Sequence, residues 1–106
     1  MWVATSYDNV NSFIDEDKPL IIFKHSYRCS LSSMALNRIE NISEELSQKA
    51  KFVLVDVINQ RDLSTEISRY FNIKHESPQV IFYHQNEVQF ADSHLNINSS
   101  KIMDYL

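Results

Sequence analysis

One residue stands out as a candidate nucleophile: Cys29, the single cysteine in the sequence. It lies between an apolar run typical of a buried strand and a segment with helical periodicity, so we expect its sulfur at the N-terminus of a helix. The free backbone N–H groups there act as about half a positive charge and stabilise a thiolate, which is the reactive form of cysteine. Arg28 and His25 add to the positive field. The alternative is that Cys29 is a small buried hydrophobic residue.

The other residues that could carry chemistry give weaker signals. The histidines, at positions 25, 75, 84 and 94, lack the close spacing of zinc ligands, and one cysteine adds little to such a site, so we expect no metal. His25 could help to deprotonate the thiol, but a structural hydrogen bond is its favoured role. Asp56 is either a buried carboxylate that transfers protons near the cysteine or a polar residue where a strand reaches solvent.

The hydrophobic pattern predicts the elements that must position these residues. Expected helices span 7–14, 31–46, 63–71 and 99–106, and expected strands span 20–23, 52–57, 79–83 and 88–91. The order α-β-α-β-α-β-β-α indicates an α/β fold with parallel crossovers and a final antiparallel hairpin. Thr5 or Ser6 is available to cap the first helix. The second helix is expected to carry one apolar stripe, formed by Leu31, Met34, Ala35, Ile39, Ile42 and Leu46.

The sequence contains no glycine. Backbone positions that need a positive φ should therefore fall on asparagine or aspartate, which tolerate it best among the remaining residues. Asn72 and Asn86 lie where such turns are expected. Glycine-rich phosphate-binding loops are excluded, and with them the nucleotide chemistry that uses those loops.

Length and charge exclude several further classes. A chain of 106 residues is expected to form one domain, residues 1–106, and we expect a monomer. Fourteen acidic and ten basic residues give a net charge of −4, which disfavours binding to nucleic acid or to an anionic membrane. We expect neither a signal peptide nor a membrane-spanning segment, and one cysteine cannot form an internal disulfide. The expected compartment is the cytoplasm.

Three segments resemble a known family. The stretch from Phe23 to Ala35 resembles the active-site segment of the monothiol bacilliredoxins of the bacillithiol system, the stretch from His75 to Val80 resembles their cis-proline loop, and Ser93-His94 resembles their Ser-His step before the last helix. The similarity runs from about Trp2 to the C-terminus. It implies a thioredoxin-like three-layer fold with a mixed four-stranded sheet. It also implies a role in reducing mixed disulfides between proteins and bacillithiol, with bacillithiol as co-substrate and no tightly bound cofactor.

The residues that follow Cys29 decide the mechanism that this resemblance implies. A dithiol enzyme needs a second cysteine three positions on, and here that position holds Ser32. Cys29 would therefore keep bacillithiol as a mixed disulfide until an outside thiol releases it. Ser32 is expected either to donate a hydrogen bond to Cys29 across one helical turn or to be an ordinary exposed serine. Ser30 stands where the family often has proline, and it retains an N–H and a hydroxyl close to the sulfur.

Pro78 is the candidate for the cis-proline of this family. A proline at the start of a strand can simply mark a strand end. The resemblance favours a cis bond that faces Cys29, which would expose the backbone of Ser77 for pairing with an extended segment of the substrate.

Two alternatives stay open. One keeps the fold and the chemistry but changes the thiol to glutathione or coenzyme A. The other is a thioredoxin-like binding module whose cysteine takes no part in catalysis, or which shares an iron–sulfur cluster between two subunits. The cluster proteins have Gly-Phe between the cysteine and the serine, whereas this sequence has Ser30-Leu31.

Overall fold

The computed structural model describes residues 2–3, 9–14 and 17–106. Its strands are β1 (Trp2–Val3), β2 (Leu20–His25), β3 (Lys51–Asp56), β4 (Gln79–His84) and β5 (Glu87–Ser93). Its α-helices are α1 (Ser30–Glu40), α2 (Glu44–Ser47), α3 (Arg61–Phe71) and α4 (Ser99–Tyr105), and two 3-10 helices are η1 (Val10–Ser12) and η2 (His94–Asn96).

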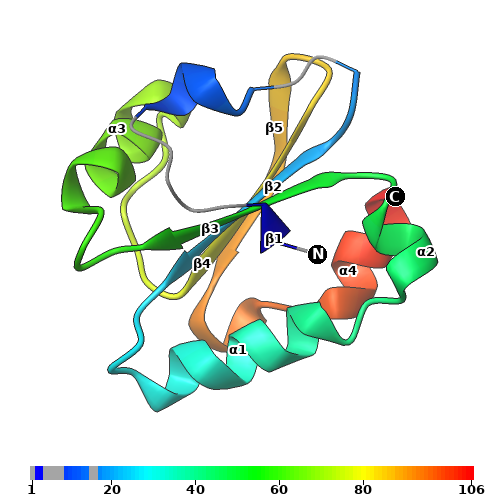
Figure 1. Cartoon of the computed structure of the whole chain (residues 1–106), viewed down its shortest axis with the longest axis horizontal. Helices are drawn as coiled ribbons and strands as arrows, with labels where there is room; N and C mark the ends of the chain where they lie inside the picture. The colour runs from blue at the N-terminus through cyan, green and yellow to red at the C-terminus, as the bar shows by residue number, and fades with distance from the viewer. Residues whose placement is uncertain (1, 4–8, 15–16) are drawn as a thin grey trace.

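The strands form a single mixed sheet in the order β1-β3-β2-β4-β5 (Figure 1). β2 runs parallel to β3 and antiparallel to β4, and β4 pairs with β5 as an antiparallel hairpin. The mixed four-stranded sheet that the sequence analysis expected is therefore confirmed. The two-residue strand β1 extends it by pairing in parallel with β3.

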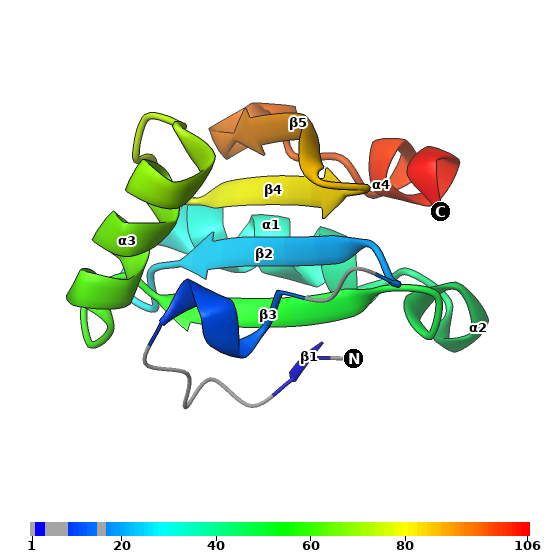
Figure 2. The ribbon, with the colours of Figure 1, turned by 90° about the horizontal axis from the view of Figure 1, so that it is seen from above.

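Helices cover both faces of the sheet, which gives three layers (Figure 2). Alternate residues of a strand point to opposite faces. Ile21 and Phe23 of β2 therefore belong to the core under α1 and α4, whereas Leu20 and Ile22 belong to the core under α3 and η1. Among the described residues, no helix has both the length and the apolar content needed to cross a membrane.

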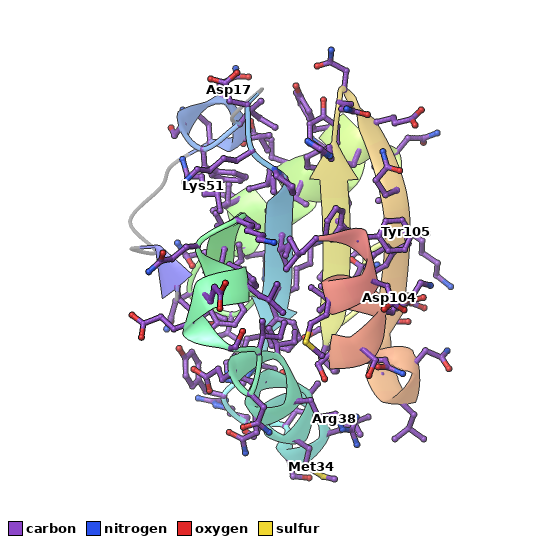
Figure 3. All side chains as sticks on the ribbon, turned by 90° about the vertical axis from the view of Figure 1, so that its right-hand side faces the viewer. Asp17, Met34, Arg38, Lys51, Asp104 and Tyr105 are labelled. Carbon is purple, nitrogen blue, oxygen red and sulfur yellow. The ribbon has the colours of Figure 1, made fainter. Side chains whose placement is uncertain are left out.

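The helix expected over 31–46 is interrupted. α1 ends at Glu40, and a second short helix begins after Ser43, whose Oγ accepts a hydrogen bond from Leu46 N at 3.3 Å. Serine is a strong N-cap residue, and here it starts a new helix in a new direction. The predicted stripe is confirmed at Ala35, Ile39 and Ile42, which are buried. Met34 departs from it, because it is 52% exposed and points away from the sheet (Figure 3), while Ser32 takes a buried position.

The N-terminal prediction is wrong in the part that the structure describes. Within residues 9–14 the chain forms only the 3-10 helix η1, which Asn9 caps by accepting a hydrogen bond from Ser12 N at 3.2 Å. An asparagine immediately before the first apolar residue stops the helix from extending backwards. Thr5, Ser6 and Tyr7, which were expected to cap or belong to this helix, lie outside the described residues.

Asparagine replaces glycine at two positions with positive φ, as predicted. Asn72 ends α3 with φ 53°, and Asn86 lies in the β4–β5 turn with φ 65°. Gln85 (φ 55°) and His94 (φ 54°) adopt the same region without being expected to. Gln85 and Asn86 are the two central residues of the hairpin, where a positive φ at both matches the right-handed twist of the strands.

We predict that Asn72→Ala lowers the free energy of unfolding by about 1 kcal/mol, because alanine pays the full steric penalty of the left-handed region. Asn72→Gly should not destabilise the protein through this term. Asn41→Ala is the matched control, since Asn41 ends α1 with φ −79°. Urea denaturation followed by circular dichroism measures all three. Equal losses for Asn72→Ala and Asn41→Ala would contradict the prediction.

Candidate active site

Cys29 is the N-cap residue of α1, in the turn that follows β2. It is partly exposed, and its side chain makes no capping hydrogen bond. Its backbone is fixed on both sides, because Cys29 N donates to Ser26 O at 3.2 Å and Cys29 O accepts from Ser33 N at 3.1 Å. Cys29 therefore lies at the N-terminus of an 11-residue helix, in a half-buried position outside both apolar core clusters. Arg28 and Ser30 flank it, and both are exposed.

The side chain of Ser32 joins the two ends of the loop that carries Cys29. Its Oγ lies 2.6 Å from His25 Nδ1 and accepts a hydrogen bond from Ser26 N at 3.0 Å. The residue is fully buried. Both expectations for Ser32 were therefore wrong: it is not an exposed serine, and within the described residues the structure records its hydroxyl bonded to His25 and Ser26 rather than to Cys29. The helical rotation that exposes Met34 also turns Ser32 inward.

His25 is the buried partner of this serine. Its ring is stacked on Phe23 at a centroid distance of 5.8 Å and meets Tyr27 edge-on at 4.3 Å. Burial lowers the pKa of His25 below its ordinary value, although the charges of Asp56 and Glu40 oppose the shift. The structural hydrogen bond favoured for His25 is thus present.

The Ser77–Pro78 peptide bond is cis, as the resemblance predicted. The pairing of Lys24 with Gln79 places the start of β4 beside the end of β2, so the Pro78 loop and the Cys29 loop leave the sheet at the same end. The loop is tied to the last strand, because His94 N donates to Pro78 O at 3.1 Å and Ser93 donates its hydroxyl proton to Glu76. The bond from His94 N forms with His94 in its positive-φ conformation.

Ser77 has unused hydrogen-bonding groups in this loop. Its Oγ is buried and has no partner among the described residues. For the same part of the chain, the structure records no hydrogen bond to the backbone N–H or C=O of Ser77. A buried polar group without a partner is rare in a folded protein, which makes Ser77 a candidate for contact with a ligand.

Asp56 stabilises a turn. Its two carboxylate oxygens accept hydrogen bonds from Ile58 N, Asn59 N and Asn59 Nδ2 at 2.8 to 3.2 Å. Burial raises the pKa of Asp56, but these bonds and nearby His25 outweigh that effect and hold the pKa below its ordinary value. Of the two roles considered for Asp56, the structure favours a polar strand end, because a carboxyl that exchanges protons near neutral pH needs a raised pKa.

A fully buried lysine went unrecognised in the sequence. Lys24 is the fifth residue of β2, and its Nζ lies 3.0 Å from Ser64 O, 2.7 Å from Ser68 Oγ and 3.1 Å from His75 Nδ1. Burial lowers the pKa of Lys24 to about 8. The signal was available, because strand alternation places position 24 on the same face as the apolar residues 20 and 22. An inward lysine requires acceptors, and α3 and the Pro78 loop supply them.

No group of three or more histidine, cysteine, aspartate or glutamate residues that could hold a metal ion occurs in the described part of the chain. The functional groups at this end of the sheet include a thiol, several hydroxyls, imidazoles, cationic side chains and the carboxylates of Asp56 and Glu76.

The fold and the helix-terminal cysteine define the class of thioredoxin-fold proteins, and solved structures agree. A thioredoxin-fold protein described as a candidate oxidoreductase is 30% identical, covers 82% of this chain and 76% of its own, and superposes with a TM-score of 0.72. Thioredoxins of Malassezia sympodialis (23% identity, 98% and 85% coverage, TM-score 0.70) and Fasciola hepatica (16%, 85% and 79%, 0.61) share the fold.

A comparison with models of protein families identifies one family within this class. The family model of the monothiol bacilliredoxin BrxC matches residues 4–102. The chain therefore belongs to the monothiol bacilliredoxin family, as the residues around Cys29 and Pro78 had indicated.

We predict that Ser32→Ala lowers the free energy of unfolding by about 1–3 kcal/mol, because it leaves the buried His25 Nδ1 and the half-buried Ser26 N without this partner. Ser33→Ala is the matched control, since Ser33 is exposed on the same turn and should change the stability by less than about 0.5 kcal/mol. Urea denaturation at pH 7 measures both variants. Similar values for the two would show that the Ser32 hydroxyl contributes nothing.

A second prediction concerns Lys24 and alkaline pH. The pKa of Lys24 is about 8 in the native state against 10.5 in the unfolded chain, so between these values the unfolded state binds more protons and native stability rises with pH. Lys24→Met removes this contribution. The stability of the wild type relative to Lys24→Met should increase from pH 7.5 to pH 10 in urea denaturation. A constant difference across this range would contradict a buried, titrating Lys24.

Proposed function

We propose that this protein is a monothiol oxidoreductase that removes bacillithiol from protein cysteines. The observation that carries the proposal is the position of Cys29: a half-buried cysteine at the N-terminus of α1 in a member of the monothiol bacilliredoxin family. The reaction is a thiol–disulfide exchange, so its electrons come from the thiols that take part.

The first step transfers bacillithiol to the enzyme. The Cys29 thiolate attacks the bacillithiol sulfur of the mixed disulfide, a new S–S bond forms between Cys29 and bacillithiol, and the bond to the substrate protein breaks. The substrate cysteine leaves as a thiolate and takes a proton from solvent. The substrate is reduced, and the oxidised centre now resides on Cys29.

The second step needs an outside thiol. A second bacillithiol, as its thiolate, attacks the sulfur of the bound bacillithiol, which releases the Cys29 thiolate and oxidised bacillithiol. Ser32 cannot perform this attack, because it carries oxygen where a dithiol enzyme carries sulfur, and its hydroxyl is bonded to His25.

The helix terminus contributes most to this release step. Stabilising a thiolate increases the fraction ionised but reduces its intrinsic nucleophilicity, so the gain in the attack is small. A stabilised thiolate is also a better leaving group, and that effect has no offset when the outside thiol arrives. The N–H groups of the first turn of α1 stabilise the departing thiolate. They include the N–H that Ser30 retains where the family often has proline.

The Pro78 loop supplies a surface for the substrate. The unused backbone groups of Ser77 suit an extended peptide that pairs with the loop edge to edge. Arg28 and Tyr27, which is 63% exposed, stand next to the cysteine in the sequence and suit contact with the protein that carries the mixed disulfide. A reducing compartment such as the cytoplasm, a monomeric enzyme and bacillithiolated proteins as partners complete the proposal.

The test is turnover of a reporter protein that carries one bacillithiol mixed disulfide. Wild-type protein with excess bacillithiol should free the reporter thiol, and Cys29→Ser should reduce the rate to background. Ser33→Ala is the control for a change on the same helical turn and should retain the rate. Reporters that carry glutathione or coenzyme A should react more slowly. Activity that survives in Cys29→Ser, or no activity with any of the three thiols, would overturn the proposal.

A further inference from the structure

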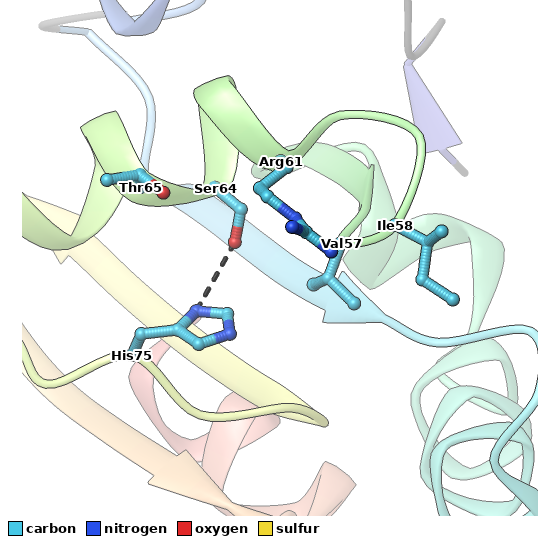
Figure 4. Close-up of a pocket in the computed structure, with 6 residues that line it drawn as sticks. All are labelled: Val57, Ile58, Arg61, Ser64, Thr65 and His75. Atoms are coloured by element: carbon cyan, nitrogen blue, oxygen red, sulfur yellow. Dashed lines mark hydrogen bonds between the residues drawn. The ribbon is translucent and has the colours of Figure 1, made fainter.

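A recess opens at the end of the sheet where the Cys29 loop begins (Figure 4). It has a volume of about 380 Å³ and is lined by Val57, Ile58, Arg61, Ser64, Thr65 and His75. Val57 N donates to His25 O at 3.0 Å, so one wall of the recess is bonded to the residue that precedes the Cys29 loop. From His25 to Cys29 the chain spans four residues, which is at most about 14 Å.

The lining of the recess offers hydrogen-bond donors but no acidic group. None of the six residues is acidic, two carry hydroxyl groups, and two carry nitrogen donors. Among the described residues, the structure records no hydrogen bond or ion pair for the Arg61 guanidinium. In Figure 4 this guanidinium points toward Val57 on the same side as the His75 ring.

Lys24 fixes the role of His75. An ammonium group can only donate, so the 3.1 Å contact between Lys24 Nζ and His75 Nδ1 makes Nδ1 an acceptor. Burial and the charge of Lys24 lower the pKa of His75, although Glu76 opposes the shift, so the imidazole is neutral near pH 7. A neutral imidazole that accepts at Nδ1 carries its proton at Nε2. His75 therefore presents an N–H to its surroundings.

Lys24 adds a buried positive charge behind this donor. Its three contacts are a carbonyl, a hydroxyl and an imidazole nitrogen, none of which carries negative charge. A buried cation without a counter-ion is costly, and a nearby anion would compensate for it. The recess that His75 lines is the adjacent space in which such an anion can be held.

We propose that this recess binds a carboxylate of the low-molecular-weight thiol while its sulfur reacts at Cys29, with Arg61 and His75 as the donors. The inference rests on the proposed function and adds a specificity site to it. A thiol the size of a tripeptide extends about 10 Å, and one wall of the recess is bonded to His25, the residue that precedes the Cys29 loop. Bacillithiol carries carboxylates, and a guanidinium is the side chain best suited to hold one.

The first experiment compares two mixed disulfides on the same reporter protein: one with bacillithiol and one with cysteamine, which has no acidic group. Arg61→Gln should raise KM for the bacillithiol substrate about tenfold, the loss of one charge-assisted hydrogen bond, and leave kcat unchanged. KM for the cysteamine substrate should change less than twofold. Arg69→Gln, which makes the same charge change in the last turn of α3, is the matched control and should alter neither KM.

The second experiment does not depend on turnover. The Cys29→Ser variant is titrated with reduced bacillithiol while the side-chain resonances of His75 and Arg61 are followed by NMR. Both should shift with bacillithiol and stay unchanged with cysteamine.

The outcomes separate this inference from the proposed function. Turnover of the bacillithiol substrate with an unchanged KM in Arg61→Gln, together with unshifted His75 and Arg61 resonances, would overturn the carboxylate site and leave the proposed function standing. An equal rise in KM for both substrates would show that Arg61 contacts the reporter protein, which also overturns the inference. Resonance shifts without turnover would support the site while contradicting the proposed reaction.

Discussion

The buried hydrogen bond between Ser32 Oγ and His25 Nδ1 holds together the two elements that Cys29 lies between. β2 ends at His25 and α1 begins at Ser30, so the loop of four residues would be free to move if nothing joined its two ends. The 2.6 Å contact, with Ser26 N donating to the same oxygen, fixes where the first turn of α1 stands relative to the sheet. The field that the helix N-terminus exerts on the sulfur depends on this placement, because it acts only within the first turn.

The last two residues of β2 point to opposite faces of the sheet and bind different segments. His25 lies on the α1 side and orders the loop that carries the nucleophile, whereas Lys24 lies on the α3 side and binds α3 and His75. His75 precedes the cis Ser77–Pro78 bond by two residues. The loop with Cys29 and the loop with Pro78 are thus both anchored to the end of one strand. This anchoring fixes the position of one loop relative to the other.

Much of this arrangement could be predicted from local sequence. Dense apolar runs identified β2 and β3, the position of Cys29 between a strand and a helix identified its N-cap role, and the absence of glycine pointed to Asn72 and Asn86. These features depend on neighbouring residues alone. The pairing of Ser32 with His25 depends on which way α1 is rotated. The burial of Lys24 depends on Ser68, 44 residues along the chain, and the positive φ of His94 accompanies a bond to Pro78 in another loop. Ser43 is a residue type that often caps a helix, so a new helix could have been predicted there. The apolar spacing that continues to Leu46 favoured one unbroken helix instead.

The central claim is that the Cys29 sulfur, and no other group, receives bacillithiol from a modified protein. Mixing equimolar enzyme and bacillithiolated reporter without free thiol, then recording intact masses and the modified peptide, tests this directly. The account predicts an enzyme heavier by one bacillithiol, with the adduct on Cys29, and a reporter that has lost it. A covalent enzyme–reporter conjugate as the main product, or an enzyme of unchanged mass, would contradict it.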